Sequence, residues 1–404
     1  RLFTINENVE LRTPNSTLKT TALRFDRNNQ TAYYLTRSTL YRKDLKLTSD
    51  KGVYNTQLEQ IRLRGNVVAV DPEYQLATDT LLYYPNTNYY RFLGPSTLLR
   101  DSSTIYCNLG SYGADHAQLN LGRGASILSP ASFIAADSIS YNLNEEAGEL
   151  FAEALVADSA KGFVLEAPYI LYAKSPNYVD AHSPVYYRQS LDSDTMYAKG
   201  DTLSIREDSA GFRTVHMFEH TAFYSEKFQG RSTRFTYFES KEELALYPNP
   251  LLWGDKSQFK CDSALLMLAE EQLDSLYLHQ NVRIVSQSKD SSYFDAASGK
   301  FLYGSFTDNS LERILLEGNA QSIMHNFSSA ATPDGVNTTA CSSITTFFEA
   351  GEVRSVKAST AVEAQYLPWD NGGKSAASLE GCTPQFNERT EKEEVRPIPA
   401  LKLR

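Results

Sequence analysis

Two histidines have the spacing of a metal site, but their context argues against one. His216 and His220, in "HMFEH", are four residues apart. A zinc site of the HExxH type needs a helix and a glutamate directly after the first histidine. This segment alternates as a strand does, so the two side chains would share a face about 13 Å apart. We therefore expect no metal site in the chain.

Paired carboxylates are the next candidates, because glycosidic-bond cleavage commonly uses two acidic side chains at a set separation. The adjacent pairs are Glu145-Glu146, Glu242-Glu243 and Glu270-Glu271. All three fall in segments that we predict to be turns, where acidic residues are common and solvated. We therefore predict that the protein is not an enzyme and has neither catalytic residues nor a cofactor.

The four cysteines do not form a metal-binding pattern. Cys107, Cys261, Cys341 and Cys382 include no CxxC motif and no Cys/His cluster. Separate, half-buried thiols are the plainer interpretation. A disulfide between Cys341 and Cys382, which would fix the C-terminal tail, is the alternative in an oxidising compartment.

Composition narrows the class of protein. The 404 residues carry 39 Lys+Arg against 49 Asp+Glu, and the net charge of -10 argues against nucleic-acid binding. The 25 Tyr and 20 Phe favour β structure. No run approaches the roughly 20 apolar residues of a transmembrane helix. The start "RLFTINENVE" has no leader features, and because it begins with Arg1, we expect that a leader or upstream segment has been removed.

The segments that hold these residues belong to a repeat. An Asp-(Ser/Thr) motif followed by apolar residues recurs about every 60 residues, and weaker copies lie between, so the unit is about 30 residues long. That length is typical of stacked repeat architectures. The clearest copies begin at Asp79, Asp137, Asp201 and Asp262, and the weaker ones at Cys107, Ala167 and Ser232.

Each copy predicts short strands separated by turns. A strand of about five residues leads into a turn rich in Asn, Asp, Gly and Glu, and a second strand follows. We expect the pairs Gly65-Asn66, Gln280-Asn281 and Gly318-Asn319 to form further turns before a third strand, because Gly and Asn tolerate positive φ. The segment Ala264–Leu278 also fits an amphipathic helix, but the repeat favours strand, turn and strand.

One face of every copy is apolar. The positions two and four after the motif's Asp are usually apolar, and alternate residues of a strand share a face. Stacked copies would therefore align these side chains into one continuous apolar lining. The predicted lining residues are Leu81, Tyr83, Ile139, Tyr141, Leu203, Ile205, Leu266, Leu276 and Leu278.

The repeat resembles a known family over roughly residues 20 to 367. The segments "LRGNVVAVDPEYQLATDTLLYYP", "LYLHQNVRIVS" and "YGSFTDNSLERILLEGNAQSIM" are similar to the OstA-like (LptA-like) family of lipopolysaccharide-transport proteins. The similarity is clearest in the C-terminal half, where "GVNTTACSSITTFFEAGEVRSVKAS" also fits a longer, multi-repeat branch of the family.

The resemblance implies an all-β fold and a transport function. Members form an elongated, open β-jellyroll, the β-taco, with an apolar groove between two facing sheets. They are periplasmic and pass lipopolysaccharide from an inner-membrane extractor to an outer-membrane translocon, so outer-membrane association is a further expectation. The groove would shield the acyl chains of lipid A. The alternative is a structural β-solenoid, a scaffold or an adhesin, with a filled core and no groove.

The repeats also predict an organisation along the chain. We divide them into residues 1–205 and 206–368, which are continuous repeats, followed by a loosely ordered tail at 369–404. An open stack exposes unpaired strand edges, which can recruit a partner's strand. We expect such edges near Leu23–Leu35 and at Val353–Val362, and thus edge-to-edge assembly with a jellyroll partner or a second copy. The predicted contact residues at the C-terminal edge are Val353, Val356 and Val362.

Overall fold

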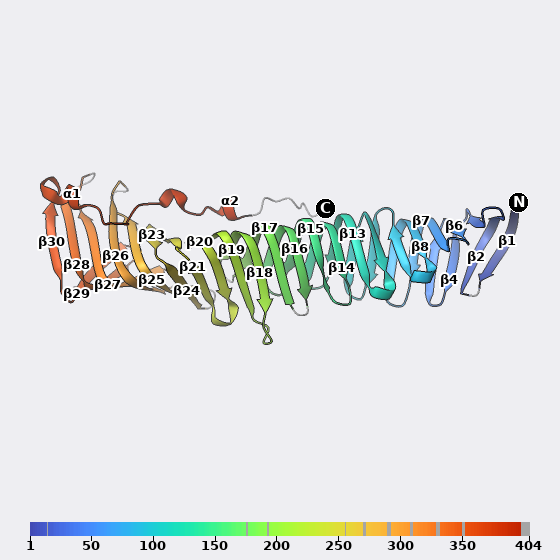
Figure 1. Cartoon of the computed structure of the whole chain (residues 1–404), viewed down its shortest axis with the longest axis horizontal. Helices are drawn as coiled ribbons and strands as arrows, with labels where there is room; N and C mark the ends of the chain where they lie inside the picture. Colours follow the sequence, from blue (N-terminus) through green and yellow to red (C-terminus); the bar gives the residue numbers. More distant parts are fainter. Residues whose placement is uncertain are drawn as a thin grey trace. The chain divides into compact units, whose positions relative to one another are not determined.

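The prediction of an all-β protein is confirmed. The computed structural model describes residues 1–13, 15–174, 177–191, 194–254, 256–269, 272–288, 292–307, 310–328, 332–349 and 352–396, and antiparallel strands dominate them (Figure 1). Helical segments in this part of the chain have at most five residues. They are η1 (Pro85–Thr87), η2 (Ala114–His116), η3 (Glu239–Lys241), η4 (Trp369–Gly373), α1 (Lys374–Ala376), η5 (Phe386–Glu388) and α2 (Lys392–Val395).

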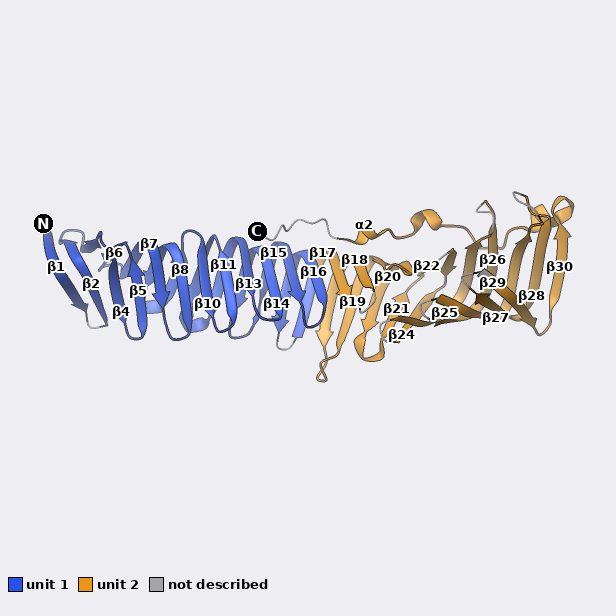
Figure 2. Cartoon of the chain, turned by 180° about the vertical axis from the view of Figure 1, so that it is seen from behind, with its two compact units in different colours: residues 1–181 blue, residues 182–404 orange. Residues whose placement is uncertain are grey.

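The chain divides into two compact units (Figure 2). Unit 1 is Arg1–Ala181 and unit 2 is His182–Arg404, and the boundary falls within β17 (Asn177–Ser190). The division of the repeats at residue 205 stays a prediction about how the copies are grouped.

Unit 1 begins with regular strands earlier than the repeat pattern indicated. β1 starts at Leu2, so the first rung precedes the segment Leu23–Leu35 that we expected at this edge. The strands of unit 1 before the boundary are β1 (Leu2–Thr13), β2 (Ser16–Asp26), β3 (Thr31–Tyr34), β4 (Ser38–Arg42), β5 (Leu45–Ser49), β6 (Lys51–Asn55), β7 (Gln60–Val70), β8 (Tyr74–Tyr84), β9 (Tyr89–Phe92), β10 (Ser96–Arg100), β11 (Ser103–Cys107), β12 (Leu109–Gly113), β13 (Gln118–Leu128), β14 (Ser132–Asn142), β15 (Ala147–Asp158) and β16 (Phe163–Lys174).

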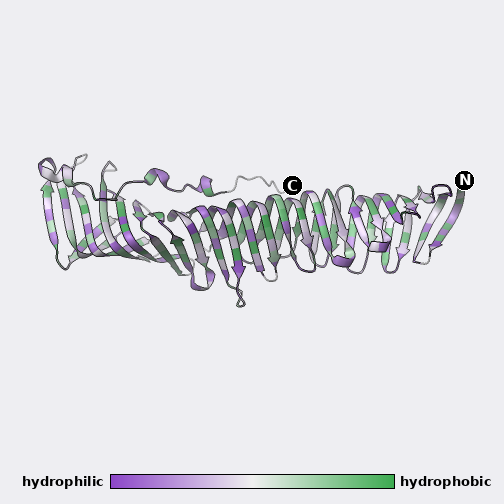
Figure 3. Cartoon of the chain, viewed as in Figure 1, coloured by the Kyte–Doolittle hydropathy of each residue, from purple (hydrophilic) through white to green (hydrophobic). Residues whose placement is uncertain are grey.

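The strands of unit 1 form two antiparallel ladders. In long strands such as β7 and β8, one half pairs in the first ladder and the other half pairs in the second. Short strands such as β9 and β10 belong to one ladder each. The ladders face one another, because the hydroxyl of Tyr74 in one donates to that of Tyr90 in the other at 2.7 Å. Apolar and polar residues alternate along the strands (Figure 3), which places one face of each ladder in the core.

The Gly-Asn and Gln-Asn pairs correct one of our predictions. They do not separate strands but lie inside β7, β25 (Gln272–Gln287) and β27 (Ser310–Asn326). In β7, the register passes from Arg64 to Val67 across Gly65 (φ 77°) and Asn66 (φ 45°). Two left-handed residues then oppose a single partner residue, and such a bulge bends a strand without ending its ladder.

Unit 2 repeats this plan. The segment that also fitted a helix is strand on both sides, in β24 up to Ala269 and in β25 from Gln272, and the two residues between lie outside the described part of the chain. Beyond β17, the strands are β18 (Thr195–Glu207), β19 (Arg213–Tyr224), β20 (Phe228–Phe238), β21 (Glu243–Tyr247), β22 (Leu251–Gly254), β23 (Ser257–Lys260), β24 (Ser263–Ala269), β25, β26 (Phe294–Thr307), β27, β28 (Gly335–Glu349), β29 (Glu352–Ser359) and β30 (Glu363–Pro368).

The two ladders of unit 2 share their long strands. One ladder runs from β20 through β21 and β24 to β29, and the other from β20 through β22 and β23 to β30. β25, β26, β27 and β28 bend at their middle and contribute to both. The last rungs therefore have two facing walls that the same strands build.

Candidate functional site

A pocket of about 400 Å³ lies in the last rungs of unit 2. Its volume is within the range of small-molecule sites in proteins. The strands β25 to β29 supply most of its walls, in which apolar and polar side chains are about equally frequent. The apolar lining includes Ile284, Ile314, Leu316, Ile323, Ile344, Phe348, Val353 and Val356.

The register of the strands explains why these side chains meet. Ile314 of β27 lies opposite Thr346 of β28, which in turn lies opposite Val356 of β29. Residues that oppose one another across an antiparallel ladder share its face. Leu316 and Ile344 are paired in the same way, two residues along, so one wall of the pocket consists of consecutive rungs of a single inward face.

Polar groups line another part of the pocket. Lys256, Ser286, Asp295, His325 and Asn326 belong to it. The His325 ring is 2% exposed, and its Nδ1 lies 3.0 Å from Asp295 Oδ1. The buried Nδ2 of Asn326 has no acceptor among the described residues. An apolar wall therefore lies beside the Lys256 side chain and the unused N–H donor of Asn326. This arrangement suits a ligand with an apolar part and an oxygen-rich part.

Aromatic rings fix the polar side of the pocket. The rings of Tyr293 and Trp369 lie 5.5 Å and 5.9 Å from that of His325, and Tyr293 meets Trp369 edge-on at 5.5 Å. Edge-to-face rings at these distances attract one another beyond the area they bury. The imidazole is thereby held in one orientation against Asp295.

The nine predicted lining residues are buried but lie outside this pocket. Their exposed fractions are 0–6%, so neighbouring side chains cover them. In unit 1, Tyr83 stacks on Tyr90 with ring centroids 4.7 Å apart, and packed rings of this kind occupy the space between the ladders. A lipid groove lined by these nine residues stays a prediction.

The residues predicted at the C-terminal edge have a second role. Val353 and Val356, which are 46% and 41% exposed, lie on β29 and also line the pocket. β29 ends at Ser359, and Val362 follows two residues with positive φ, so Val353–Val362 is not one continuous strand. Their role in docking a partner stays a prediction.

Sequence reasoning did not single out Ile314, Leu316, Ile344 or the polar rim. The alternation in "ERILLEGN" and "SSITTFFE" marks the inward positions, but it does not tell which rungs are filled and which leave space. That difference depends on the side chains of the opposite ladder, which come from distant parts of the sequence.

The other candidate groups have separate partners. His216 Nδ1 contacts Thr236 Oγ1 at 3.0 Å, whereas His220 Nδ1 contacts Asp201 Oδ2 at 2.7 Å. No group of three or more His, Cys, Asp or Glu within the described residues could hold a metal ion. Glu146 and Glu242 have the positive φ of turn positions, and Glu270-Glu271 lies outside the described residues.

All four cysteines are free thiols, so the Cys341–Cys382 disulfide is not formed. Cys341 Sγ donates to Ser343 O, and Cys382 Sγ to Ala297 O. The plainer interpretation, four separate thiols, is the one that the structure has.

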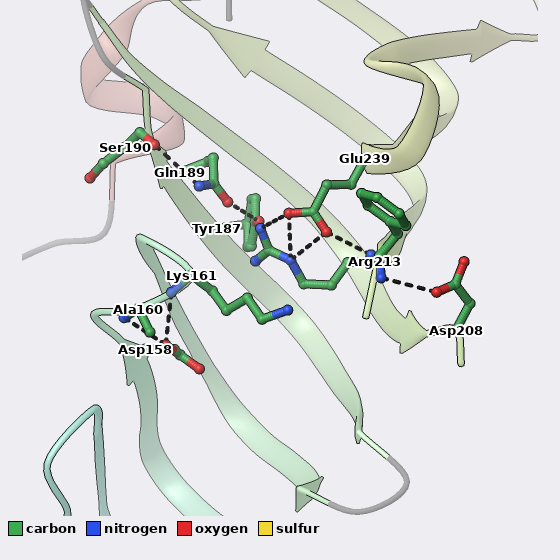
Figure 4. Close-up of polar contacts among 10 residues, drawn as sticks. Asp158, Ala160, Lys161, Tyr187, Gln189, Ser190, Asp208, Arg213 and Glu239 are labelled. Carbon is green, nitrogen blue, oxygen red and sulfur yellow. Dashed lines mark hydrogen bonds and ion pairs between the residues drawn. The ribbon is translucent and has the colours of Figure 1, made fainter. Parts of the chain in front are cut away.

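A polar cluster inside unit 2 was not foreseen (Figure 4). The Arg213 side chain is 5% exposed, and its Nη2 lies 2.7 Å from Glu239 Oε1. The backbone N–H of Arg213 donates to the other carboxylate oxygen at 2.6 Å. Nearby, the hydroxyl of Tyr187 donates to Gln189 Oε1 at 2.7 Å, and burial raises the pKa of this tyrosine. The paired charges fix the start of β19, which is a structural role.

The comparison with protein families identifies the N-terminal segment. The model of the OstA-like protein family matches residues 1–79. This segment is OstA-like. The match covers β1 to β7 and part of β8, at the opposite end from the copies whose similarity is clearest in the sequence. The OstA-like family is a periplasmic family of the lipopolysaccharide-transport type.

The chain matches no curated protein. Within the described residues, there is no helix with the length and apolar character needed to cross a membrane.

Proposed function

We propose that this protein binds lipopolysaccharide and shields lipid A acyl chains in the periplasm on the way to the outer membrane. The observation that carries the proposal is the pocket with an aliphatic wall and a polar rim in the last rungs of unit 2. Each acyl CH₂ taken out of water contributes about 0.8 kcal/mol. The rim, with Lys256 and Asn326, suits the phosphates and sugars of the head group.

The ends of the strand series suit the proposed partners, the inner-membrane extractor and the outer-membrane translocon. Among the described pairings, β1 pairs with β2 alone, and β29 and β30 pair with β28 alone. Each leaves an edge to which a partner's strand can add. On β1, the exposed fractions of Leu2, Phe3 and Ile5 are 63%, 49% and 53%, which is the apolar surface that such a contact buries.

Site-specific photo-crosslinking tests the proposal. A crosslinking amino acid at Ile344, which faces the pocket, should capture lipopolysaccharide, and one at the adjacent Thr345, on the opposite face, should not. The pair Ile139 and Ser140 makes the same comparison in unit 1. Equal capture at Ile344 and Thr345, or capture at neither, would count against the pocket as the lipid site.

A structural β-solenoid without a lipid groove is the second candidate function. The packed interior of unit 1, where Leu81 and Tyr83 are 0% and 1% exposed, favours it. If the protein is such a scaffold, no inward position of either unit should capture lipopolysaccharide. Circular dichroism should show that each crosslinking variant keeps the wild-type fold.

A further inference from the structure

The tail runs back along the outer face of unit 2. After η4 and α1, its described residues pass over the strands from β28 towards β18 (Figure 1). Arg283 Nε donates to Glu380 O at 3.1 Å, and Arg231 Nε donates to Glu388 O at 2.8 Å. The tail thus crosses many rungs and binds to several of them.

Three side chains of consecutive strands form a row beneath the tail. Gln229 of β20, Trp253 of β22 and Gln258 of β23 oppose one another in register, so they share one face. They are 2%, 0% and 3% exposed. A row of this size and burial on an outer face needs a cover, and the tail supplies it.

The two glutamines bind the tail directly. Gln258 Nε2 donates to Thr383 O at 3.0 Å, and the N–H of Gln385 donates to Gln258 Oε1 at 2.6 Å. One amide therefore satisfies a carbonyl and an N–H of an extended backbone, as a neighbouring strand would. Gln229 Oε1 accepts from Arg389 Nε at 2.7 Å. The intervening Trp253 Nε1 is buried and has no acceptor among the described residues.

The outer face of β8, in unit 1, is exposed. In β8, buried residues alternate with exposed ones, and Gln75 and Ala77 are exposed. In β22, Leu251, Leu252 and Trp253 are all buried, so both faces of the strand are covered. The outer face is therefore covered at β22 and exposed at β8.

The tail is held by buried and by half-exposed contacts. Val395 and Thr390 are 0% and 2% exposed, and the ion pair with Arg231 lies nearer the surface. Glu394 and Arg231 form a two-pronged ion pair with N–O distances of 2.9 Å and 2.5 Å, and their side chains are 35% and 36% exposed. Phe386 stacks on Phe294 at 5.7 Å. Half-exposed ion pairs contribute little stability each. The segment belongs to neither ladder, so it can open without unfolding the strands beneath it.

The strands beneath the tail also form a wall of the pocket. Ala297 and Ser322 line the pocket, and Cys382 of the tail contacts Ala297 O at 3.6 Å. A second cavity of about 710 Å³ lies between the tail and β27, β28 and β30, and Ile323 lines both cavities. The tail and a ligand in the pocket would thus contact opposite sides of β26 and β27.

We propose that residues 380–395, the strap, are a releasable segment seated in an extended-peptide site on the outer face of unit 2, and that the seated strap restricts entry to the pocket. The inference rests on the proposed function in taking this pocket as the ligand site. Releasing the strap frees the outer side of β26 and β27, so that their wall can move to admit an apolar chain.

The strap carries its own reporter. Burial raises the pKa of the Cys382 thiol to about 11, and the other three cysteines are buried in strands or beside them. On release, its pKa should return towards 9.0. At pH 8 its thiolate fraction, and hence its labelling rate with a disulfide reagent, should then rise by up to about a hundredfold. A Trp369→Phe background leaves Trp253 as the sole tryptophan, whose emission should shift to the red.

The test compares charge variants of the full chain. Arg231→Glu should release the strap, and the exchange Arg231→Glu with Glu394→Arg should restore it. Arg91→Ala, at an exposed arginine of unit 1, is the matched control. Cys382→Ser must abolish the added labelling. If Arg231→Glu leaves both the Cys382 rate and the Trp253 emission at wild-type values while the protein stays folded, no releasable strap exists.

Ligand entry into the pocket is measured with an apolar fluorescent dye, N-phenyl-1-naphthylamine. The binding of lipid A is measured separately. Release should raise the rate of dye uptake severalfold, and Ile344→Glu in the pocket should remove that gain. A strap that opens without changing dye uptake, or a gain that survives Ile344→Glu, overturns control of the pocket. If dye uptake responds as expected but lipid A does not bind, the strap stands and the proposed function fails.

Discussion

At the scale of single residues, the rim of the pocket distinguishes a ligand site from a packing defect. A packing defect is apolar on all sides, and its lining makes no demand for hydrogen bonds. Here, Asn326 presents a buried N–H without an acceptor beside Lys256 and the Asp295–His325 pair. Because an unsatisfied buried donor costs stability, a ligand oxygen that accepts from Asn326 would gain that free energy on binding.

The residue-scale prediction concerns Asn326. The substitution Asn326→Asp replaces the donor by an acidic acceptor, which should repel a phosphate-bearing head group. The affinity for lipid A should fall about tenfold or more, because a hydrogen bond to a charged group contributes about 1.5–3 kcal/mol. Equilibrium binding of fluorescent lipid A measures it. Asn120→Asp, in a strand of unit 1, is the control, and an equal loss in both variants would refute a specific role of Asn326.

At the scale of elements, the bulges determine how a strand serves both ladders. Gly65 has a φ of 77°, and a Cβ there would lie 3.0 Å from Asp50 Oδ2. Asp50 also accepts from Asn66 Nδ2 at 2.8 Å, and this hydrogen bond fixes the bend of β7 at the bulge. The bend of β7 therefore depends on a small residue with a left-handed backbone, followed by a residue with an amide side chain.

The substitution Gly65→Ala should destabilise unit 1 by about 1–2 kcal/mol, because a Cβ disfavours the left-handed conformation. Gly113→Ala is the matched control, since Gly113 has a φ of -95° and its nearest new contact would be 3.8 Å away. Urea unfolding followed by circular dichroism measures both. Equal losses in the two variants would contradict the role given to backbone conformation.

The second element-scale prediction concerns the C-terminal edge. Val356→Pro removes an N–H from β29, the last strand of its ladder, and should weaken edge-to-edge assembly while the other rungs stay folded. Val356→Thr keeps the N–H and should assemble as the wild type does. Sedimentation velocity compares the three proteins. Unchanged association of a folded proline variant would exclude β29 as the docking edge.

The sequence predicted elements better than it predicted the site, and the reason is physical. Alternation along "DTLLYYP" places Leu81 and Tyr83 inward, and the structure buries both. The same local pattern does not reveal whether a facing side chain fills the space, so the pocket at Ile314 and Ile344 was missed. The Gly-Asn pairs were correctly identified as positive-φ positions. Pairing with the adjacent strand makes them bulges inside a strand and not turns between strands.

At the scale of the whole molecule, the interiors of the two units differ. Unit 1 holds the OstA-like match and an interior packed with rings and aliphatic side chains. Unit 2 holds the pocket and the segment that covers its outer face. A ligand bound at equilibrium should therefore stabilise the last rungs of unit 2 first, because stabilisation acts where the contacts are made.

Hydrogen exchange with mass spectrometry tests this difference in the intact chain. Saturating lipid A should slow exchange in β25 to β29, whose residues line the pocket, and leave β7 to β14 near their unliganded rates. The variant Ile344→Glu should lose the protection, because it places a charge against the acyl chains. Protection that extends evenly through unit 1 would instead mean that the ligand enters between its ladders. In that case Leu81, Tyr83 and Ile139 would be displaced from their packed positions to form the continuous lining that the repeat predicted.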